Sequence, residues 1–144
     1  MSWADRYIGL PFAEGGRGPA AFDCWGLVAA VLRVECSIEV EPFADIKTYD
    51  SPAVAARVAA EIARTDWLLV DRAGAQAFDV AIMLVTRRLM GRDTARTLSH
   101  IGIVVAPNRL LHIERETRSV CVRFSSPSVA WRLHSFYRHR SFGA

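Results

Sequence analysis

The sequence predicts an α+β fold in which helices pack on an antiparallel sheet. Apolar residues recur with helical spacing only in the first half of the chain, in residues 24–35 and 52–64. From residue 67 onward the pattern changes to an alternation with period two, which is typical of strands. Helices that come first and strands that follow favour an α+β arrangement over alternating βαβ units.

The helical half contains three expected elements separated by loops. Ser2 is suited to cap a short helix through Tyr7, and the nine residues 13–21 contain three glycines and a proline, which predicts a loop. Asp23 stands at the N-cap of the helix 24–35. The second long helix begins at Asp50-Ser51-Pro52, with the proline in its first turn.

The second half is expected to form six strands. Their predicted ranges are 67–71, 79–86, 100–106, 109–114, 119–124 and 131–137. Residues 87–98, which contain four arginines, are interpreted as a long basic connection between the second and third strands.

The hairpin between the third and fourth strands decides how two histidines lie. If residues 106–108 form a three-residue loop, Val105 pairs with Arg109, and His112 lies opposite Gly102 and diagonal to His100 on the same face. A two- or four-residue loop would place the two histidines on opposite faces. The sequence permits the first register without proving it.

Length and composition indicate one domain, residues 1–144, with a hydrophobic core. The chain has 51% hydrophobic and 23% charged residues and a net charge of +3, and it has no Lys/Arg run interleaved with aromatics. Nucleic-acid binding is therefore not predicted. The longest apolar stretch, Gly26–Leu32, is too short to cross a membrane. Neither a cofactor nor a metal is predicted, and the first residues do not resemble a signal peptide.

Cys24 is the first candidate catalytic residue. It follows the glycine-rich loop and stands on the first turn of a predicted helix, where the partial positive charge of the helix N-terminus favours a thiolate. Free amides at the same place would stabilise an oxyanion. A cysteine that only fills the core is the alternative. Cys36 and Cys121 are expected to be structural, and a bridge between them stays open.

A thiolate nucleophile needs a base, and the base needs a partner that orients it. His100 opens one predicted strand and His112 lies in the next. A single strand histidine is more often a half-exposed sheet residue. Two histidines on adjacent strands, together with a cysteine at a helix start, favour a catalytic site. His134 and His139 are expected at the surface.

Several segments resemble the NlpC/P60 peptidases. Tyr7–Gly16 (YIGLPFAEGG) and Phe22–Val28 (FDCWGLV) resemble the family's Gly-x-Pro-Tyr-x-x-Gly-Gly and Asp-Cys-Ser-Gly-Leu-Val signatures. Further along, Phe78–Val80 resembles its Gly-Asp-Leu/Val strand start, His100–Val105 (HIGIVV) its His-Val-Gly-Ile-Tyr motif, and Leu110–His112 the segment of its third catalytic residue. The match runs in order from Tyr7 to His112.

The resemblance implies a papain-like fold and a peptidase that cleaves peptide stems of peptidoglycan, between D-glutamate and a diamino acid. Cys24 would be the nucleophile, His100 the base and His112 the residue that orients it. Asp23 matches a position that holds the free amine of the substrate. Two residues depart from the family: Phe12 replaces a tyrosine whose hydroxyl lies near the oxyanion, and Trp25 replaces a small serine that contacts substrate.

The resemblance also suggests a setting. Trp25 and the closing Phe136-Tyr137-Arg138 look like the branch of the family found in phage tails and gene transfer agents. That branch implies phage-tail or baseplate proteins as partners, and synthesis in the cytoplasm followed by incorporation into a virion-like particle. A weakly active or inactive structural part of a baseplate, and a related thiol amidase or acyltransferase, are the alternatives.

Overall fold

The computed structural model describes residues 2–89 and 93–143. Two α-helices, α1 (Cys24–Cys36) and α2 (Ser51–Ile62), precede the sheet. Short 3-10 helices span Trp3–Tyr7, Arg72–Gly74 and Arg140–Phe142. The strands are β1 (Trp67–Val70), β2 (Val80–Leu89), β3 (Asp93–Ala106), β4 (Arg109–His112), β5 (Val120–Arg123) and β6 (Leu133–His139).

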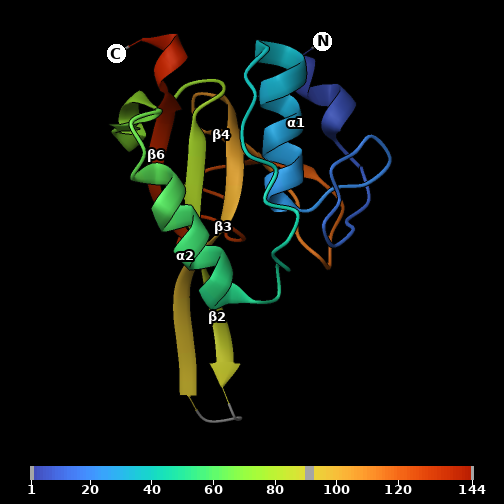
Figure 1. Cartoon of the computed structure of the whole chain (residues 1–144). Helices are drawn as coiled ribbons and strands as arrows, with labels where there is room; N and C mark the ends of the chain where they lie inside the picture. Colours follow the sequence, from blue (N-terminus) through green and yellow to red (C-terminus); the bar gives the residue numbers. More distant parts are fainter. Residues whose placement is uncertain (1, 90–92, 144) are drawn as a thin grey trace.

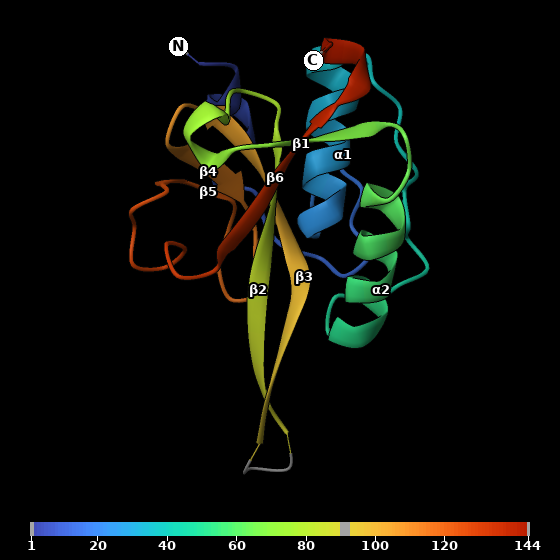
Figure 2. The ribbon, with the colours of Figure 1, turned by 90° about the vertical axis from the view of Figure 1, so that its left-hand side faces the viewer.

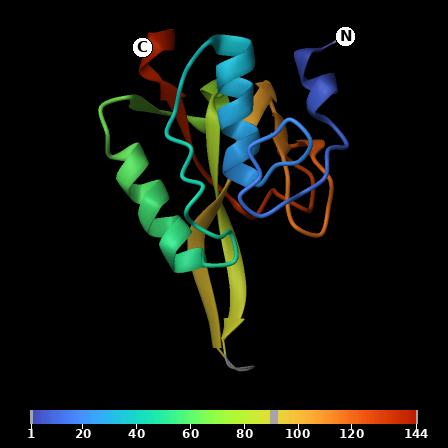
Figure 3. The same ribbon diagram turned by 45° about the vertical axis from the view of Figure 1, so that its right-hand side comes forward.

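All six strands belong to one antiparallel sheet in the order β1-β6-β2-β3-β4-β5. Both helices lie on the same side of the central strands β2 and β3, which Figure 2 shows most clearly (Figures 1 and 3 give two other views). The α+β class predicted from the sequence is thus confirmed. Within the described residues, no helix is both long and apolar enough to cross a bilayer.

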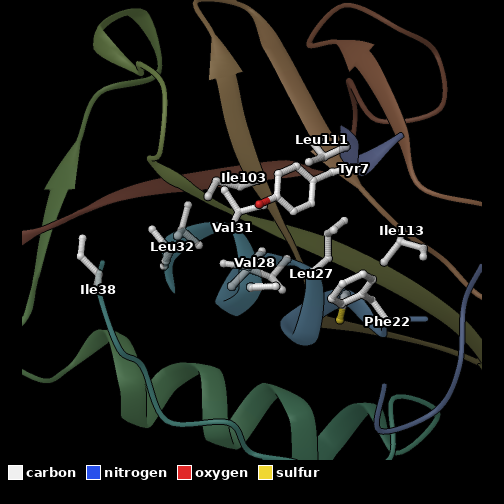
Figure 4. Close-up of a cluster of buried hydrophobic side chains, with 14 of the residues drawn as sticks. Tyr7, Phe22, Leu27, Val28, Val31, Leu32, Ile38, Ile103, Leu111 and Ile113 are labelled. Carbon is white, nitrogen blue, oxygen red and sulfur yellow. The ribbon is translucent and has the colours of Figure 1, made fainter. Parts of the chain in front are cut away.

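The core is built on α1. Asp23 caps this helix by accepting a hydrogen bond from the Gly26 N–H, and the apolar stripe predicted from the sequence is fully buried, including Leu27, Val28, Val31 and Leu32. Figure 4 shows these side chains packed with Ile103, Leu111 and Ile113. A helix that buries its apolar stripe this completely is fixed in position on the sheet, and so is the residue at its start.

The helix α2 is less deeply packed. Asp50 caps it through the Ala53 N–H, and Pro52 stands in its first turn, as the sequence predicts. Its apolar residues Val54, Val58 and Ile62 remain only half-buried, and Ser51 is its one buried residue. The apolar stripe of α2 is therefore incompletely covered by the rest of the protein.

The prediction that 87–98 is a long connection was wrong. β2 continues to Leu89 and β3 begins at Asp93, so that the two strands pair with each other well beyond the rest of the sheet (Figure 1). The connection is shorter, 90–92, and lies outside the described residues, as does Arg92 within it. Thr86 and Arg96, which pair here, are exposed. Residues 87–89 and 93–98 show no period-two alternation of apolar and polar side chains, so the sequence carried no strand signal there.

The hairpin between β3 and β4 differs from the predicted one in its turn and agrees in its register. Ala106 pairs with Arg109, which leaves a two-residue turn in which Asn108 has a φ of +66°. The predicted pairing of Val105 with Arg109 was wrong. Val105 instead forms a β-bulge, because Val104 pairs with Leu110 on its other side.

Candidate active site

Cys24 is held at the start of α1 by the glycine-rich loop. The carbonyl oxygen of Gly16 accepts hydrogen bonds from the Asp23 N–H (3.2 Å) and from the Arg17 guanidinium (2.8 Å). A Cβ added to Gly26 would lie 1.9 Å from this same oxygen, so only glycine allows the loop to approach so closely. The position of the thiol is therefore set by a packed loop on one side and by α1 on the other.

The thiol of Cys24 is buried and 6% exposed. Burial and the Asp23 carboxylate raise its pKa to about 12, although the backbone N–H groups of Ile101 and Trp25 and the Arg17 cation act in the opposite direction. This corrects the sequence-based expectation of a thiolate favoured by the helix N-terminus. The resting residue is a neutral thiol, and losing its proton requires a base at the moment of reaction.

His100 and His112 meet as the sequence predicts. Nε2 of His100 lies 2.9 Å from Nδ1 of His112, so one ring donates a hydrogen bond to the other. His112 reaches this position because it lies opposite Gly102: a Cβ at Gly102 would be 3.1 Å from the Cβ of His112. Both histidines are buried, with 5% and 3% of their surface exposed.

Glu114 and Arg132 complete this cluster and were not predicted. The Arg132 guanidinium donates from both terminal nitrogens to the two carboxylate oxygens of Glu114, at 2.9 and 2.8 Å. The Glu114 Oε1 also lies 3.8 Å from Nδ1 of His112. Glu114 follows His112 by two residues, which is a local signal for a shared face. Arg132 is eighteen residues away along the chain, and no local pattern marks it.

The charges of Glu114 and Arg132 shift the pKa values of the two histidines in opposite directions. Burial and the neighbouring His112 lower the pKa of His100 to about 3; Glu114 raises it and Arg132 lowers it. Burial likewise lowers the pKa of His112, with the same opposed contributions. For Glu114, burial alone would raise the pKa, but Arg132 and the two histidines bring it to about 2. At neutral pH the cluster therefore holds two neutral imidazoles and one Glu–Arg ion pair.

The thiol lies against the strand that carries His100. Its sulfur faces the backbone N–H of Ile101, the residue directly after His100. Among the described residues, no hydrogen bond joins the Cys24 thiol to a ring nitrogen of His100. Catalytic hydrogen bonds often tighten only when substrate binds, and in the resting protein the sulfur faces backbone N–H groups instead.

Asp23 has structural partners in the resting protein. It is 1% exposed, and its Oδ1 accepts from the Gly26 N–H at 2.8 Å and from Arg17 at 2.7 Å. These contacts cap α1 and fix Arg17. The predicted binding of a substrate amine by Asp23 stays a prediction, and it would have to share a carboxylate that already has two donors.

Trp25 and Phe12 contact different parts of the protein. The Trp25 indole N–H donates to the Glu41 carbonyl at 2.6 Å, and its ring lies 5.6 Å from that of Phe43. Trp25 therefore anchors the segment before α2. Phe12 is half-buried, and the Arg115 guanidinium lies 5.4 Å from its ring centroid. The ring of Phe12 thus has a cation over it and also packs against the hydrophobic core. The substrate contacts predicted for both residues stay predictions.

A pocket opens beside Cys24, between α2 and the sheet, and it encloses about 670 Å³ of empty space including its open mouth. Val54, Val58 and Ile62 of α2 line one side, and Val80, Ile82 and Ile101 of the sheet line the other. Cys24 and Trp25 form part of its wall. The nucleophile candidate thus borders this pocket.

Three possible metal ligands come together in the histidine cluster. The nearest ligand atoms of His100, His112 and Glu114 all lie within 4.8 Å of one another. Each group already has a partner, because the two rings bond to each other and Arg132 takes both oxygens of Glu114. This donor set does not fit a metal ion, which would need the same lone pairs.

No protein-family model matches the chain, and no curated protein sequence matches it. Solved structures do. A lipoprotein-like NLP/P60 family protein from Staphylococcus aureus subsp. aureus Mu50 superposes with a TM-score of 0.59 at 23% identity, over 94% of this chain and 38% of that protein. The chain thus spans less than half of the staphylococcal protein.

A second solved structure is the NlpC/p60 domain of the peptidoglycan hydrolase SagA. It superposes with a TM-score of 0.58 at 16% identity, over 94% of this chain and 92% of that one. In both cases the likeness extends over nearly the whole chain and includes the two helices and the antiparallel sheet. The chain therefore has the papain-like α+β fold of NlpC/P60 proteins.

Proposed function

We propose that this protein is a cysteine peptidase that hydrolyses peptide stems of bacterial peptidoglycan. The observation that supports it most directly is the arrangement of three residues: Cys24 at a helix start, packed against the backbone next to His100, which is itself bonded to His112. The fold shared with a peptidoglycan hydrolase domain supports the choice of substrate. The bond that we propose is the one between D-glutamate and a diamino acid.

The hydrogen bond between the histidines assigns a task to each ring nitrogen. Since Nε2 of His100 faces His112, Nδ1 of His100 is the nitrogen left to accept the thiol proton. For Nδ1 to be free of a proton, Nε2 must carry it and donate to His112. His112 would thus orient the base and set its tautomer. The ion pair with Arg132 supports this role, because it engages both oxygens of Glu114 and leaves Nδ1 of His112 as an acceptor.

In the proposed reaction, His100 takes the proton of Cys24 as the sulfur attacks the amide carbonyl. The S–C bond forms, the C–N bond breaks, and His100 returns the proton to the leaving amine. Water then releases the acyl group from sulfur. The amides of the α1 N-terminus are available to stabilise the oxyanion that forms in each half of the reaction.

Incubation of the protein with purified wall peptides, followed by mass spectrometry, tests the proposal. Cleavage at one bond creates a free amine and a mass loss that identify the site. We expect Cys24→Ala and His100→Ala each to abolish cleavage, and the double variant to lose little more than either, because the pair acts as a unit. Fully additive losses would show that the two residues do not cooperate.

His112 is tested by two substitutions of similar size. His112→Asn keeps an oxygen that accepts from His100, and we expect about a tenfold loss of kcat. His112→Leu offers no acceptor, and we expect a loss on the order of a hundredfold. Equal losses in the two variants would argue against an orienting role.

We further propose that the protein is made in the cytoplasm and works within a phage-tail-like particle, with baseplate proteins as partners. The likeness of Trp25 and the closing aromatic segment to that branch of the family supports this setting. A structural baseplate component with little activity is the second candidate. The raised pKa of Cys24 and the partners already held by Asp23 favour it. Retained cleavage of wall peptides would exclude it.

A further inference from the structure

The pocket between α2 and the sheet is lined by apolar side chains from both sides. Val54, Val58 and Ile62 on α2 face it while remaining only half-buried. Val80 and Ile82, on the opposite wall, lie beneath α2 in the core of the sheet. An apolar helix stripe that its own protein leaves partly uncovered gains stability when an apolar group covers it.

Two polar side chains in the pocket wall, Glu61 and Ser99, are already paired with protein groups. Glu61 accepts a hydrogen bond from the Trp67 indole at 3.0 Å. Ser99 shares a hydrogen bond with Thr97 at 2.8 Å. A polar ligand group placed among them would therefore have to compete for donors and acceptors that are in use, whereas an apolar group would not.

The positions of Cys24 and His100 indicate which half of a substrate would lie in the pocket. Cys24 lines the pocket, as do Ser99 and Ile101 on either side of His100, whereas His100 itself does not. In the proposed reaction the acyl group becomes bonded to Cys24, and the leaving amine takes a proton from His100. The acyl half therefore belongs on the pocket side of the scissile bond, and the amine half on the His100 side.

We infer that this pocket binds an apolar group on the acyl side of the scissile amide, such as an aliphatic or aromatic side chain. This inference rests on the proposed role of Cys24 and narrows the substrate: the segment that donates the carbonyl carries an apolar group within reach of α2. Charged groups of the substrate would stay at the mouth, where Arg17 and Arg57 also border the pocket.

Two isomeric amides give a direct test. N-methylheptanamide carries its alkyl chain on the acyl side, and N-hexylacetamide carries it on the amine side. We would titrate each into the Cys24→Ala variant, in which no covalent chemistry occurs, and follow tryptophan fluorescence, since Trp25 and Trp67 line the pocket. We expect the heptanamide to bind at least tenfold more tightly than its isomer. Equal affinities would overturn the inference.

A pair of substitutions on α2 locates the binding. In the Cys24→Ala background, Val58→Phe fills the pocket and should weaken binding of N-methylheptanamide at least tenfold. Ala59→Phe places the same ring on the exposed side of α2 and should leave binding unchanged. Val54→Phe serves in place of Val58→Phe if thermal melting shows that the latter does not fold. Unchanged affinity in a folded Val58→Phe or Val54→Phe protein would also overturn the inference.

The two proposals fail in different ways. If the Cys24→Ala protein prefers the heptanamide but the unmodified protein releases no amine from wall peptides, the apolar pocket stands and the peptidase function does not. If wall peptides are cleaved and the two isomers bind equally, the peptidase function stands and the apolar acyl-side pocket does not.

Discussion

Nε2 of His100 and Nδ1 of His112 lie 2.9 Å apart, and the Glu114 carboxylate lies just beyond hydrogen-bonding distance of the same His112 nitrogen, at 3.8 Å. Arg132 holds that carboxylate through both of its oxygens. The ion pair thus adjusts the basicity of the histidines without taking a hydrogen bond from them.

The first prediction is that removing the charge of Glu114 and removing the charge of Arg132 shift the pKa of His112 in opposite directions. Glu114 raises the pKa of His112 and Arg132 lowers it. Glu114→Gln should therefore lower the pKa of His112, and Arg132→Gln should raise it, in an NMR titration of the imidazole resonances. If both variants shift the pKa the same way, the charges are not what tunes the ring.

A second ion pair provides the control for this experiment. Arg138 also binds both oxygens of a carboxylate, that of Asp79, through Nε and one terminal nitrogen at 2.8 Å each. Arg138→Gln should reduce the melting temperature, as Arg132→Gln also should, while leaving the pKa of His112 unchanged. This comparison separates a loss of structure from a loss of charge at the site.

The second prediction concerns Gly102. A Cβ there would lie 2.9 Å from Leu110 Cδ1 and 3.0 Å from the Leu111 carbonyl, as well as close to His112. Gly102→Ala should push β4 away, cost roughly 1–3 kcal/mol of stability and reduce activity further by displacing His112. Gly74→Ala is the matched change, because nothing lies within 4 Å of its Cβ. Equal melting temperatures for the two variants would contradict the close approach.

The third prediction is that Cys24 reacts slowly in the free protein. Burial raises its pKa to about 12, whereas Cys36 and Cys121 are only half-buried. Brief treatment with iodoacetamide at pH 7.5, followed by peptide mapping, should label Cys36 and Cys121 ahead of Cys24. Fastest labelling at Cys24 would mean that the thiolate forms without substrate, as the sequence alone suggested.

The fourth prediction is a loss of stability on mild acidification. The pKa of His100 falls from 6.5 in a model compound to about 3 in the fold, so the unfolded chain binds a proton that the folded chain does not. The contribution of His100 to the free energy of unfolding is fully present above pH 6.5 and declines as the pH falls from there towards 3. Between pH 7.5 and 5 the loss is about 2 kcal/mol from this residue alone.

Thermal melting at several pH values measures this effect. The native protein should lose melting temperature steadily below pH 6.5. His100→Asn removes the titrating ring, so its melting temperature should change less over the same interval, even if it starts lower. A pH dependence that is unchanged in His100→Asn would show that another group is responsible.

The elements with strong local patterns were the ones that sequence predicted well. The α1 helix has a capping aspartate and a complete apolar stripe. Each of the six strands overlaps its predicted range, although β3 begins at Asp93, seven residues before the predicted start at 100. The outer parts of β2 and β3 were missed because residues 87–89 and 93–98 do not alternate between apolar and polar side chains.

The candidate site was predictable where its residues are neighbours along the chain or across one hairpin. His100 and His112 fall in this class, while the place of Cys24 at a helix start follows from the local N-cap signal of Asp23. The bulge at Val105 was not predictable, since nothing in the residues 104–109 distinguishes it from a three-residue loop. Arg132 and the pocket beneath α2 depend on contacts between distant segments. The high pKa of Cys24 likewise follows from how the surrounding chain buries it, which a helix-start argument does not contain.

Because of the bulge at Val105, the face of the sheet on which His112 lies depends on whether the number of residues between His100 and His112 is odd or even. With the two-residue turn alone, His112 would lie opposite Ile103 and point away from His100; the one extra residue in β3 restores the shared face. Adding or removing a single residue between His100 and His112 would therefore leave a hairpin that still folds but separates the two rings, whereas a change of two would keep them together. Tolerance to insertions in this hairpin should depend on whether their length is odd or even.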